Sequence, residues 1–191
     1  PDKERVFREI VRVLKPGGEL YFSDVFADRR LSDAAQSDPV LVGECLGGAM
    51  YLEDFRRMLH SLGLRDYRVV SASSVTVQDE KLSKKLGDAQ FASLTIRAFK
   101  IGSLEDRCED FGQTATYKGT VPGSEESFRL DRDHVFKKGE AVLVCGNTAD
   151  MLTETRLAPH FAVTERGEHR GVFAECKTPD ADSGAGSSCC C

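Results

Sequence analysis

Cysteine is the residue type in this 191-residue sequence with the greatest potential for chemistry, and Cys45 has the most suggestive surroundings. It lies in the stretch GECLGGAMYLEDF (43–55), after Glu44 and just before Gly47-Gly48. Glycines allow close approach of the backbone to a ligand, and a thiol near a helix N-terminus gains thiolate character. An adjacent carboxylate opposes that ionisation, and cysteine is also a common buried packing residue. These residues alone allow Cys45 to be either a packing residue or a thiolate ligand.

Cys145 has a comparable but weaker context, because LVCGNTADML reads as a strand end followed by a Gly-Asn turn and a helix. Packing beneath a loop is the simpler interpretation of this residue. Cys108 and Cys176 have no local context that suggests chemistry. The run Cys189–Cys191 is expected to be exposed, and its thiols are suited to soft-metal binding, mixed disulfides or lipidation. The simple prenylation box is absent, since Ser188 occupies the fourth position from the end.

The remaining composition excludes several classes of protein. The first four of the seven cysteines are far apart and form no CxxC pair, which argues against a zinc ribbon. An odd count without a signal peptide argues against a disulfide framework and favours reduced thiols in the cytoplasm. A net charge of −5 without a basic block gives no general attraction to nucleic acid or to an anionic membrane. The sequence contains no Walker loop, no GxGxxG after a strand, no membrane-spanning apolar run and no histidine at a defensible triad spacing.

The first hundred residues predict an α/β arrangement that positions Cys45. Apolar residues at helical spacing (Val6, Ile10 and Leu14) predict a helix that ends at Lys15, before Pro16. The apolar run 19–26 predicts a parallel strand covered on both faces. Further elements are expected as an irregular segment at 28–42, a helix from Leu52 to Leu62, a strand at 67–77, a short helix at 79–88 and a strand at 91–100. The last two strands would close the edge of a sheet that begins with the strand at 19–26, and the missing strands of this sheet would lie upstream of Pro1.

The chain begins within a predicted helix, so we expect it to be the C-terminal part of a longer protein. We divide it into a core at 1–105, a small α+β domain at 106–176 and a disordered cysteine-rich tail at 177–191. The second domain is expected to contain short strands followed by an amphipathic helix from Thr148 to about Leu157.

Several stretches resemble known enzymes. PDKERVFREIVRVLKPGGELYFSDV resembles the last helix and inner strand of a class I S-adenosylmethionine-dependent methyltransferase. GECLGGAMYLEDF, GDAQFASLTIRAFK and FKKGEAVLVCGNTADML are similar to segments of arsenite methyltransferases, in the same order. The resemblance runs from Pro1 to about Phe161. It implies the C-terminal part of a class I (Rossmann-like) sheet followed by a small α+β domain.

The resemblance also implies an activity, the transfer of methyl groups from S-adenosylmethionine to trivalent arsenic for detoxification. Cys45 then falls on an arsenic ligand of the family and is the expected catalytic residue. Thiolates suit this role because trivalent arsenic is soft and thiophilic. Cys145 is a second, weaker candidate for an arsenic ligand. The family further implies a thiol reductant such as glutathione or thioredoxin, a cytoplasmic monomer, and no nucleic-acid or membrane partner.

The family's other arsenic-binding cysteines and its cofactor-binding glycine loop would lie upstream, so no residue here is assigned to the cofactor. Ala89 stands where some animal members have a cysteine, and we assign it no role. The chain alone is therefore expected to be inactive. Two alternatives stay open: a non-catalytic thiol-rich module that binds arsenic or another soft metal ion, and a class I methyltransferase with an organic substrate.

Overall fold

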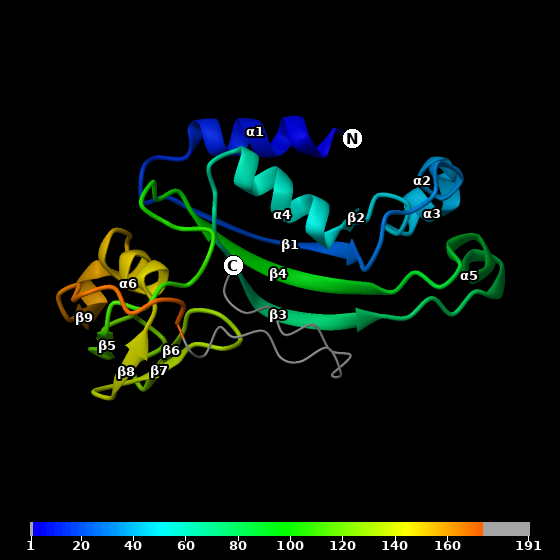
Figure 1. Cartoon of the computed structure of the whole chain (residues 1–191). Helices are drawn as coiled ribbons and strands as arrows, with labels where there is room; N and C mark the ends of the chain where they lie inside the picture. Colours follow the sequence, from blue (N-terminus) through cyan, green and yellow to red (C-terminus); the bar gives the residue numbers. More distant parts are fainter. Residues whose placement is uncertain (1, 174–191) are drawn as a thin grey trace.

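The computed structural model describes residues 2–173, which form two adjoining units, each built around a β-sheet (Figure 1). This mixed α/β organisation confirms the predicted fold class. The elements of the first unit are α1 (Lys3–Val13), β1 (Glu19–Ala27), α2 (Asp33–Ser37), α3 (Pro39–Gly43), β2 (Met50–Tyr51), α4 (Leu52–Ser61), β3 (Tyr67–Val75), α5 (Glu80–Leu86) and β4 (Phe91–Phe99).

The first unit has a four-stranded sheet in the order β2-β1-β4-β3. The late strand β4 inserts between β1 and β3 and runs antiparallel to both, as the expected closure of a sheet edge requires. Among the residues that the structure describes, β1 has one parallel partner, β2, which it pairs with at Phe26 and Ala27. Tyr21 in β1 is 53% exposed, so the prediction of a parallel strand covered on both faces is wrong for most of its length.

Helices α1 and α4 cover the same face of this sheet (Figure 1). α1 begins after Asp2, whose carboxylate accepts a hydrogen bond from the Arg5 amide at 3.0 Å. It ends at Val13, two residues earlier than predicted, because Leu14 is already extended ahead of Pro16.

Phe55 of α4 is the centre of the core beneath these helices and is 1% exposed. Its ring centroid lies 5.0–5.9 Å from those of four neighbours, mostly in edge-to-face contact, which aromatic rings favour. The four are Phe7, Phe22, Phe26 and Tyr67.

Two short helices occupy the segment that was expected to be irregular. Ser32 caps α2, and Asp38 both ends α2 and caps α3, with Pro39 in the first turn of α3. Proline is well tolerated there because the first helical amides have no intrahelical partner. The Asp-Pro pair is therefore a helix start and not a break in helical structure.

The second unit contains a three-stranded sheet, a hairpin and one α-helix within the described residues. Its elements are β5 (Gln113–Tyr117), β6 (Ser127–Arg129), β7 (Val135–Lys137), β8 (Ala141–Val144), α6 (Gly146–Thr153) and β9 (Phe161–Val163). The sheet has the order β8-β5-β9, and β6 pairs with β7. α6 begins two residues before the predicted start and ends four residues before the predicted end, and β9 was not predicted.

The two units are joined through buried polar contacts as well as through the chain. Arg68 of β3 and Arg97 of β4 are register partners, on the sheet face opposite α1 and α4. Arg68 reaches Asp131 of the second unit at 3.3 Å, and Arg97 donates to the carbonyl oxygen of Leu130. Phe99, at the end of β4, packs in the apolar core of the second unit. The domain division at residue 105 stays a prediction.

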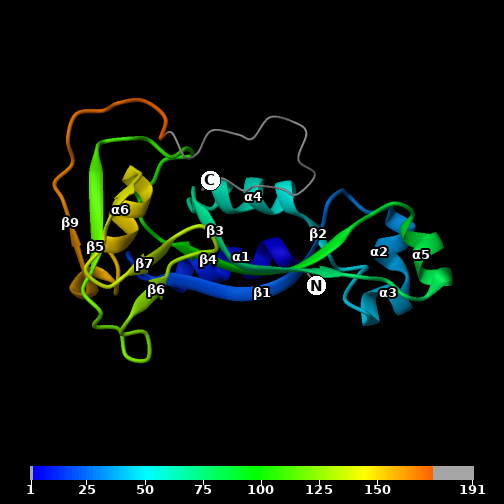
Figure 2. The same ribbon diagram turned by 90° about the horizontal axis from the view of Figure 1, so that it is seen from below.

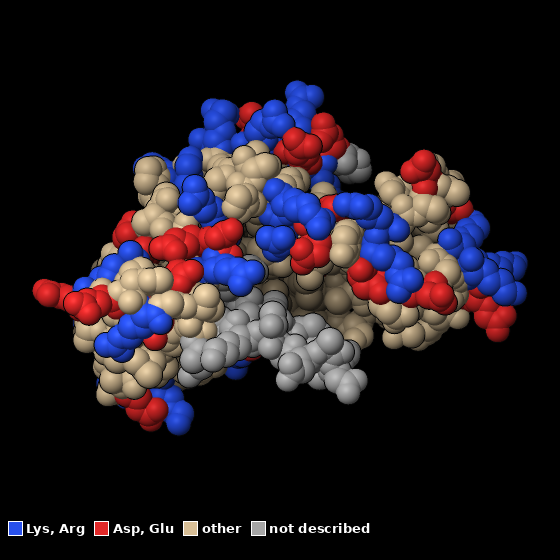
Figure 3. Space-filling model, viewed as in Figure 1, with Lys and Arg blue, Asp and Glu red and all other residues tan. Residues whose placement is uncertain are grey.

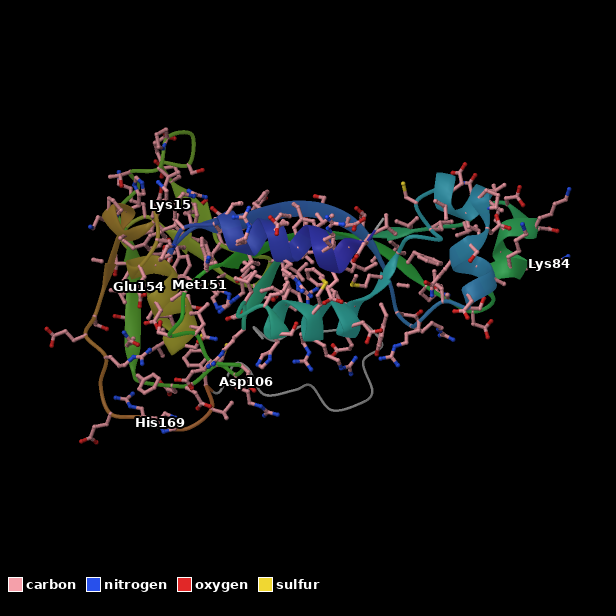
Figure 4. The ribbon with its side chains drawn as sticks, turned by 90° about the horizontal axis from the view of Figure 1, so that it is seen from above. Lys15, Lys84, Asp106, Met151, Glu154 and His169 are labelled. Atoms are coloured by element: carbon pink, nitrogen blue, oxygen red, sulfur yellow. The ribbon has the colours of Figure 1, made fainter. Side chains whose placement is uncertain are left out.

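The turn before β1 also contacts the second unit. Gly17 has φ 73°, and a Cβ added there would lie 2.5 Å from the carbonyl oxygen of Glu154, just beyond α6. Figure 4 shows Lys15 and Glu154 at the same end of the molecule. A glycine is therefore required at position 17 both by its backbone angle and by this close approach.

None of the helices in residues 2–173 is long and apolar enough to cross a membrane. The predicted disordered tail at 177–191, which contains Cys189–Cys191, lies outside the described residues, and so does Cys176.

Phe55→Ala should lower the free energy of unfolding by about 3–5 kcal/mol, because it removes the ring that four aromatic neighbours surround. Urea unfolding followed by circular dichroism would measure this loss. The control Val13→Ala alters a side chain that is 64% exposed and should change stability by no more than about 0.5 kcal/mol. Equal effects of the two substitutions would contradict the assignment of Phe55 to the core.

Candidate functional site

Cys45 is exposed in the loop between α3 and β2. Within the described residues it is therefore not a buried packing residue. The expected proximity to a helix N-terminus is also wrong: Cys45 follows the end of α3, and α4 begins only at Leu52. The thiol is therefore presented by a helix C-terminal turn.

The backbone of Cys45 is left-handed, with φ 63°, and no other non-glycine residue of the described chain has a positive φ. The turn is closed by hydrogen bonds from the amides of Cys45 to Val42 O (3.1 Å) and of Leu46 to Leu41 O (2.9 Å). This is the position after a helix where glycine is common, because other residues incur about 1–2 kcal/mol there. A cysteine in a strained backbone position points to a requirement for its side chain.

Packing beneath the loop fixes this turn. Leu41, Leu46 and Ala49 are buried and pack with Leu86 of α5 and Phe91 of β4. Lys85 of α5 also forms an ion pair with Asp38 at the start of α3. Hence α5 and β4, distant in sequence, hold the thiol-bearing loop in place.

The two glycines after Cys45 have different surroundings. A Cβ at Gly47 would lie 3.0 Å from Ala35 O and from two atoms of Val42, whereas one at Gly48 would meet no atom within 4 Å. Gly47 is thus required by packing within the loop. The close approach of a ligand, expected from the sequence, is not needed to explain it.

Cys145 has the opposite environment and is 1% exposed. It is the N-cap of α6: its sulfur accepts from the Thr148 amide at 3.5 Å and lies 3.3 Å from Thr148 Oγ1. Arg68 Nη2 lies 4.0 Å from the same sulfur. Cys108 and Phe173 complete a small buried cluster with Cys145. The local sequence predicted burial, but not the second cysteine.

The pKa of Cys145 is lowered to about 5, and the largest cause is the hydrogen bond with the Cys108 thiol. Burial opposes this change, while the positive charge of Arg68 and the two donors of Thr148 support it. Arg68 is also bound by Asp66, with 3.0 and 2.8 Å contacts, so it is shared between carboxylate and thiolate. These contacts give Cys145 the character of a thiolate held by donors.

Cys45 and Cys145 lie in separate regions of the molecule. Figure 2 shows α2, α3 and α5 at one end of the first sheet and the second unit at the other. In Figure 4, Lys84 of α5 and Met151 of α6 mark these two ends. Within residues 2–173 no three histidine, cysteine, aspartate or glutamate side chains converge as metal ligands. Each thiol would therefore contribute to a different site.

A pocket of about 700 Å³ lies where the ends of β1, β3 and β4 meet α5. Its described lining includes Phe26, Val75 and Phe91, with Asp28 and Arg132 as charged groups, but no cysteine. On the face drawn in Figure 3, cationic and anionic side chains alternate, and neither sign forms a continuous patch. Neither this pocket nor the charged surface in Figure 3 brings a further reactive group to Cys45.

Sequence reasoning missed the group of buried polar residues around Arg68. The sequence did contain a signal for the ion pair between Asp66 and Arg68, which are two positions apart. An arginine at the start of a strand can turn back to an acid that precedes the strand. Asn147 adds a hydrogen bond to Asp66 at 3.0 Å. The link to Cys145 is not predictable from spacing, since 77 positions separate it from Arg68.

Comparison with known proteins gives consistent similarities. Residues 112–186 match the family described as "Arsenite methyltransferase C-terminal domain". An arsenite methyltransferase from Aquipseudomonas alcaligenes is 50% identical over 177 residues, which are 92% of this chain and 51% of that protein. An arsenite methyltransferase from Mus musculus is 42% identical over 166 residues, or 86% of this chain and 43% of the relative.

A solved structure gives the same result for the fold. An arsenic(III) S-adenosylmethionine methyltransferase from Chlamydomonas reinhardtii matches with a TM-score of 0.85 and 47% sequence identity. The match covers 91% of this chain and 58% of the other. The chain thus spans about half the length of the curated relatives that it matches.

Cys45→Gly should raise the free energy of unfolding by about 1 kcal/mol, since glycine adopts the left-handed backbone of residue 45 without strain. Urea denaturation would measure the gain. Glu44→Gly is the matched control in the same turn: its backbone is ordinary, and it should lose about 0.5–1 kcal/mol. A destabilised Cys45→Gly variant would contradict the strain at this residue.

Stability should depend on pH through Cys145. Its pKa is lower in the folded chain, so ionisation stabilises the fold above the ordinary thiol pKa near 9, and this contribution is lost as the pH falls towards 5. Relative to Cys145→Ser, the wild type should gain unfolding free energy from pH 5 to 9, as measured by urea unfolding under a reductant. Parallel pH curves for the two proteins would contradict the lowered pKa.

Proposed function

We propose that the chain is a member of the arsenite methyltransferase family, and that it is the arsenic-binding and C-terminal portion of an S-adenosylmethionine-dependent arsenite methyltransferase. Its substrate in this proposal is trivalent arsenic bound to thiols. The observation that carries the proposal is the exposed thiol of Cys45, kept at a backbone position that favours glycine.

Cys45 suits a soft substrate for two reasons. Its sulfur is accessible, and thiolates are the preferred ligands of soft thiophilic ions. The turn that carries it is fixed by Leu41 and Leu46, which are buried against α5 and β4. A fixed turn limits the directions in which the thiolate can point, so that arsenic bound there would have a defined orientation. We propose this positioning as the catalytic role of Cys45.

One thiolate is insufficient for tight binding. Arsenic held by several thiolates gains affinity because each further contact forms within the same complex. Since Cys145 lies at the other end of the structure, it would not complete the site of Cys45 (Figure 2). The remaining ligands of a shared site would come from the part of the enzyme that this chain does not span. A role of Cys145 as an arsenic ligand stays a prediction and would define a separate site.

The described residues do not fit a site for the methyl donor. Such a site requires a glycine-rich loop that follows a strand and leads into a helix. The adjacent glycine pairs here, Gly17-Gly18 and Gly47-Gly48, instead precede β1 and β2. The donor would bring the reactive methyl group, and we derive no transfer step from this chain.

Other features of the proposal derive from family resemblance. They are a thiol reductant such as glutathione or thioredoxin, a cytoplasmic monomer, and the absence of nucleic-acid and membrane partners. The alternative of a non-catalytic thiol-rich module is not favoured by any observation, since the curated relatives above carry the name of an enzyme.

The test is an arsenite methylation assay with S-adenosylmethionine and a thiol reductant, on this chain and on the chain extended upstream to the full length of its relatives. We expect the extended protein to methylate arsenite and the present chain to be inactive. Cys45→Ser in the extended protein should lower the activity about 100-fold or more, because the substrate loses a chelating sulfur.

Cys176→Ser is the matched control, a change of a cysteine to which no role is assigned. It should retain wild-type activity. Full activity of Cys45→Ser would exclude Cys45 as a ligand, whereas inactivity of the extended wild type would overturn the proposed enzyme itself.

A further inference from the structure

Cys108 and Cys145 form a pair of buried thiols that the proposed methylation does not use. Both are 1% exposed, and they share a hydrogen bond. Backbone contacts fix their proximity: the amide of Gly146, next to Cys145, donates to Glu109 O, next to Cys108, at 2.8 Å. Two thiols held side by side meet the first requirement for a disulfide.

The surroundings of the two sulfurs differ, and this difference assigns their roles. Cys145 receives the Thr148 amide and lies near the Thr148 hydroxyl and the Arg68 guanidinium. Such donors at a helix N-terminus favour a thiolate, which is the nucleophilic form of cysteine. Cys108 lies in the same buried cluster and is hydrogen-bonded to the Cys145 sulfur, so it is the nearest thiol to any group that becomes bonded to that sulfur.

We propose that Cys108 and Cys145 form a reactive dithiol that exchanges with low-molecular-weight disulfides such as glutathione disulfide, Cys145 acting as the attacking thiolate and Cys108 as the resolving thiol. This activity is independent of arsenic methylation. The lowered pKa of Cys145 is consistent with these roles.

The exchange takes place in two steps. The Cys145 sulfur attacks one sulfur of the small disulfide, whose S–S bond breaks and releases one glutathione thiolate. Cys108 then transfers its proton to solvent and attacks the Cys145 sulfur, which releases the second glutathione thiolate. Both released thiolates take up protons according to their pKa. In balance, two protein thiols are oxidised to one disulfide, and one small disulfide is reduced to two thiols.

Access to the pair is controlled by the segment that ends at Phe173. Phe173 is 6% exposed and belongs to the same buried cluster as the two cysteines, and its amide donates to Cys108 O at 2.8 Å. The residues before it bind back to the 109–111 segment, including Arg170 N to Asp110 O at 2.8 Å. The exchange therefore requires local opening of this segment.

The experiment uses the full chain with its five other cysteines changed to serine. Samples are incubated with glutathione disulfide, quenched in acid, alkylated and mapped by mass spectrometry. We expect a Cys108–Cys145 disulfide. Adding Cys108→Ser should instead cause a glutathione adduct to accumulate on Cys145, and adding Cys145→Ser should make Cys108 react at least about ten-fold more slowly than Cys145 does.

Two matched pairs of variants test the geometry. Thr148→Val removes a donor to Cys145 and should slow the exchange several-fold, whereas Thr153→Val on the same helix should not. Phe173→Ala should accelerate the exchange several-fold, unlike Phe128→Ala, which loosens the other core of this unit.

Equal reactivity of Cys108 and Cys145 in the single-cysteine variants would overturn the assigned roles. A failure to form the disulfide until the chain is unfolded would overturn the proposal as a whole. Absence of arsenite methylation by the extended protein would leave the dithiol proposal unaffected, so the proposed function and the dithiol proposal can fail separately.

Discussion

The buried pairing of Arg68 with Arg97 is the constraint on which the arrangement of this molecule depends. The two arginines oppose each other on adjacent strands, where like charges are unfavourable unless each is neutralised. Arg68 is neutralised by Asp66 and Asp131, and Arg97 by Glu19 at 2.6 Å. Since Asp131 belongs to the second unit, the sheet of the first unit is complete electrostatically only when the second unit is docked. Removing one member of such a group is costly, because it leaves a buried charge without compensation.

The two thiols differ in how they depend on this arginine pair. Cys145 is held at the junction, and its surroundings depend on Arg68 of the other unit. Cys45 is carried at the far end, where apolar packing of α3 against α5 and β4 sets the backbone. A change at the junction should thus affect the buried sulfur through charge, while the exposed sulfur is affected only through the stability of the whole fold. The two thiols lie at opposite ends of the first sheet, and different forces set their environments: charge at Cys145 and apolar packing at Cys45.

The sequence predicted elements with strong local signals and missed those that depend on tertiary contacts. The apolar spacing of α4 and the β-branched composition of β3 are local properties, and both elements form, α4 ending one residue and β3 two residues earlier than predicted. α2 and α3 are too short for an apolar period to be visible, and only their caps reveal them. The exposure of Cys45 and the pairing of Cys145 with Cys108 follow from chain packing, which no spacing of residues encodes. The suggestion that Cys45 binds arsenic came from resemblance, not from periodicity.

The left-handed backbone of Cys45 has a consequence for experiments that select variants. In a library selected for folding or expression alone, glycine should be enriched at position 45, because it relieves the strain of the turn. Selection for folding would then report as beneficial a change that deletes the exposed thiol. The substitution of glycine at position 45 should therefore raise the abundance of the protein and abolish the chemistry of its exposed thiol. A survey of variants that measures only one of these two properties would misjudge this residue.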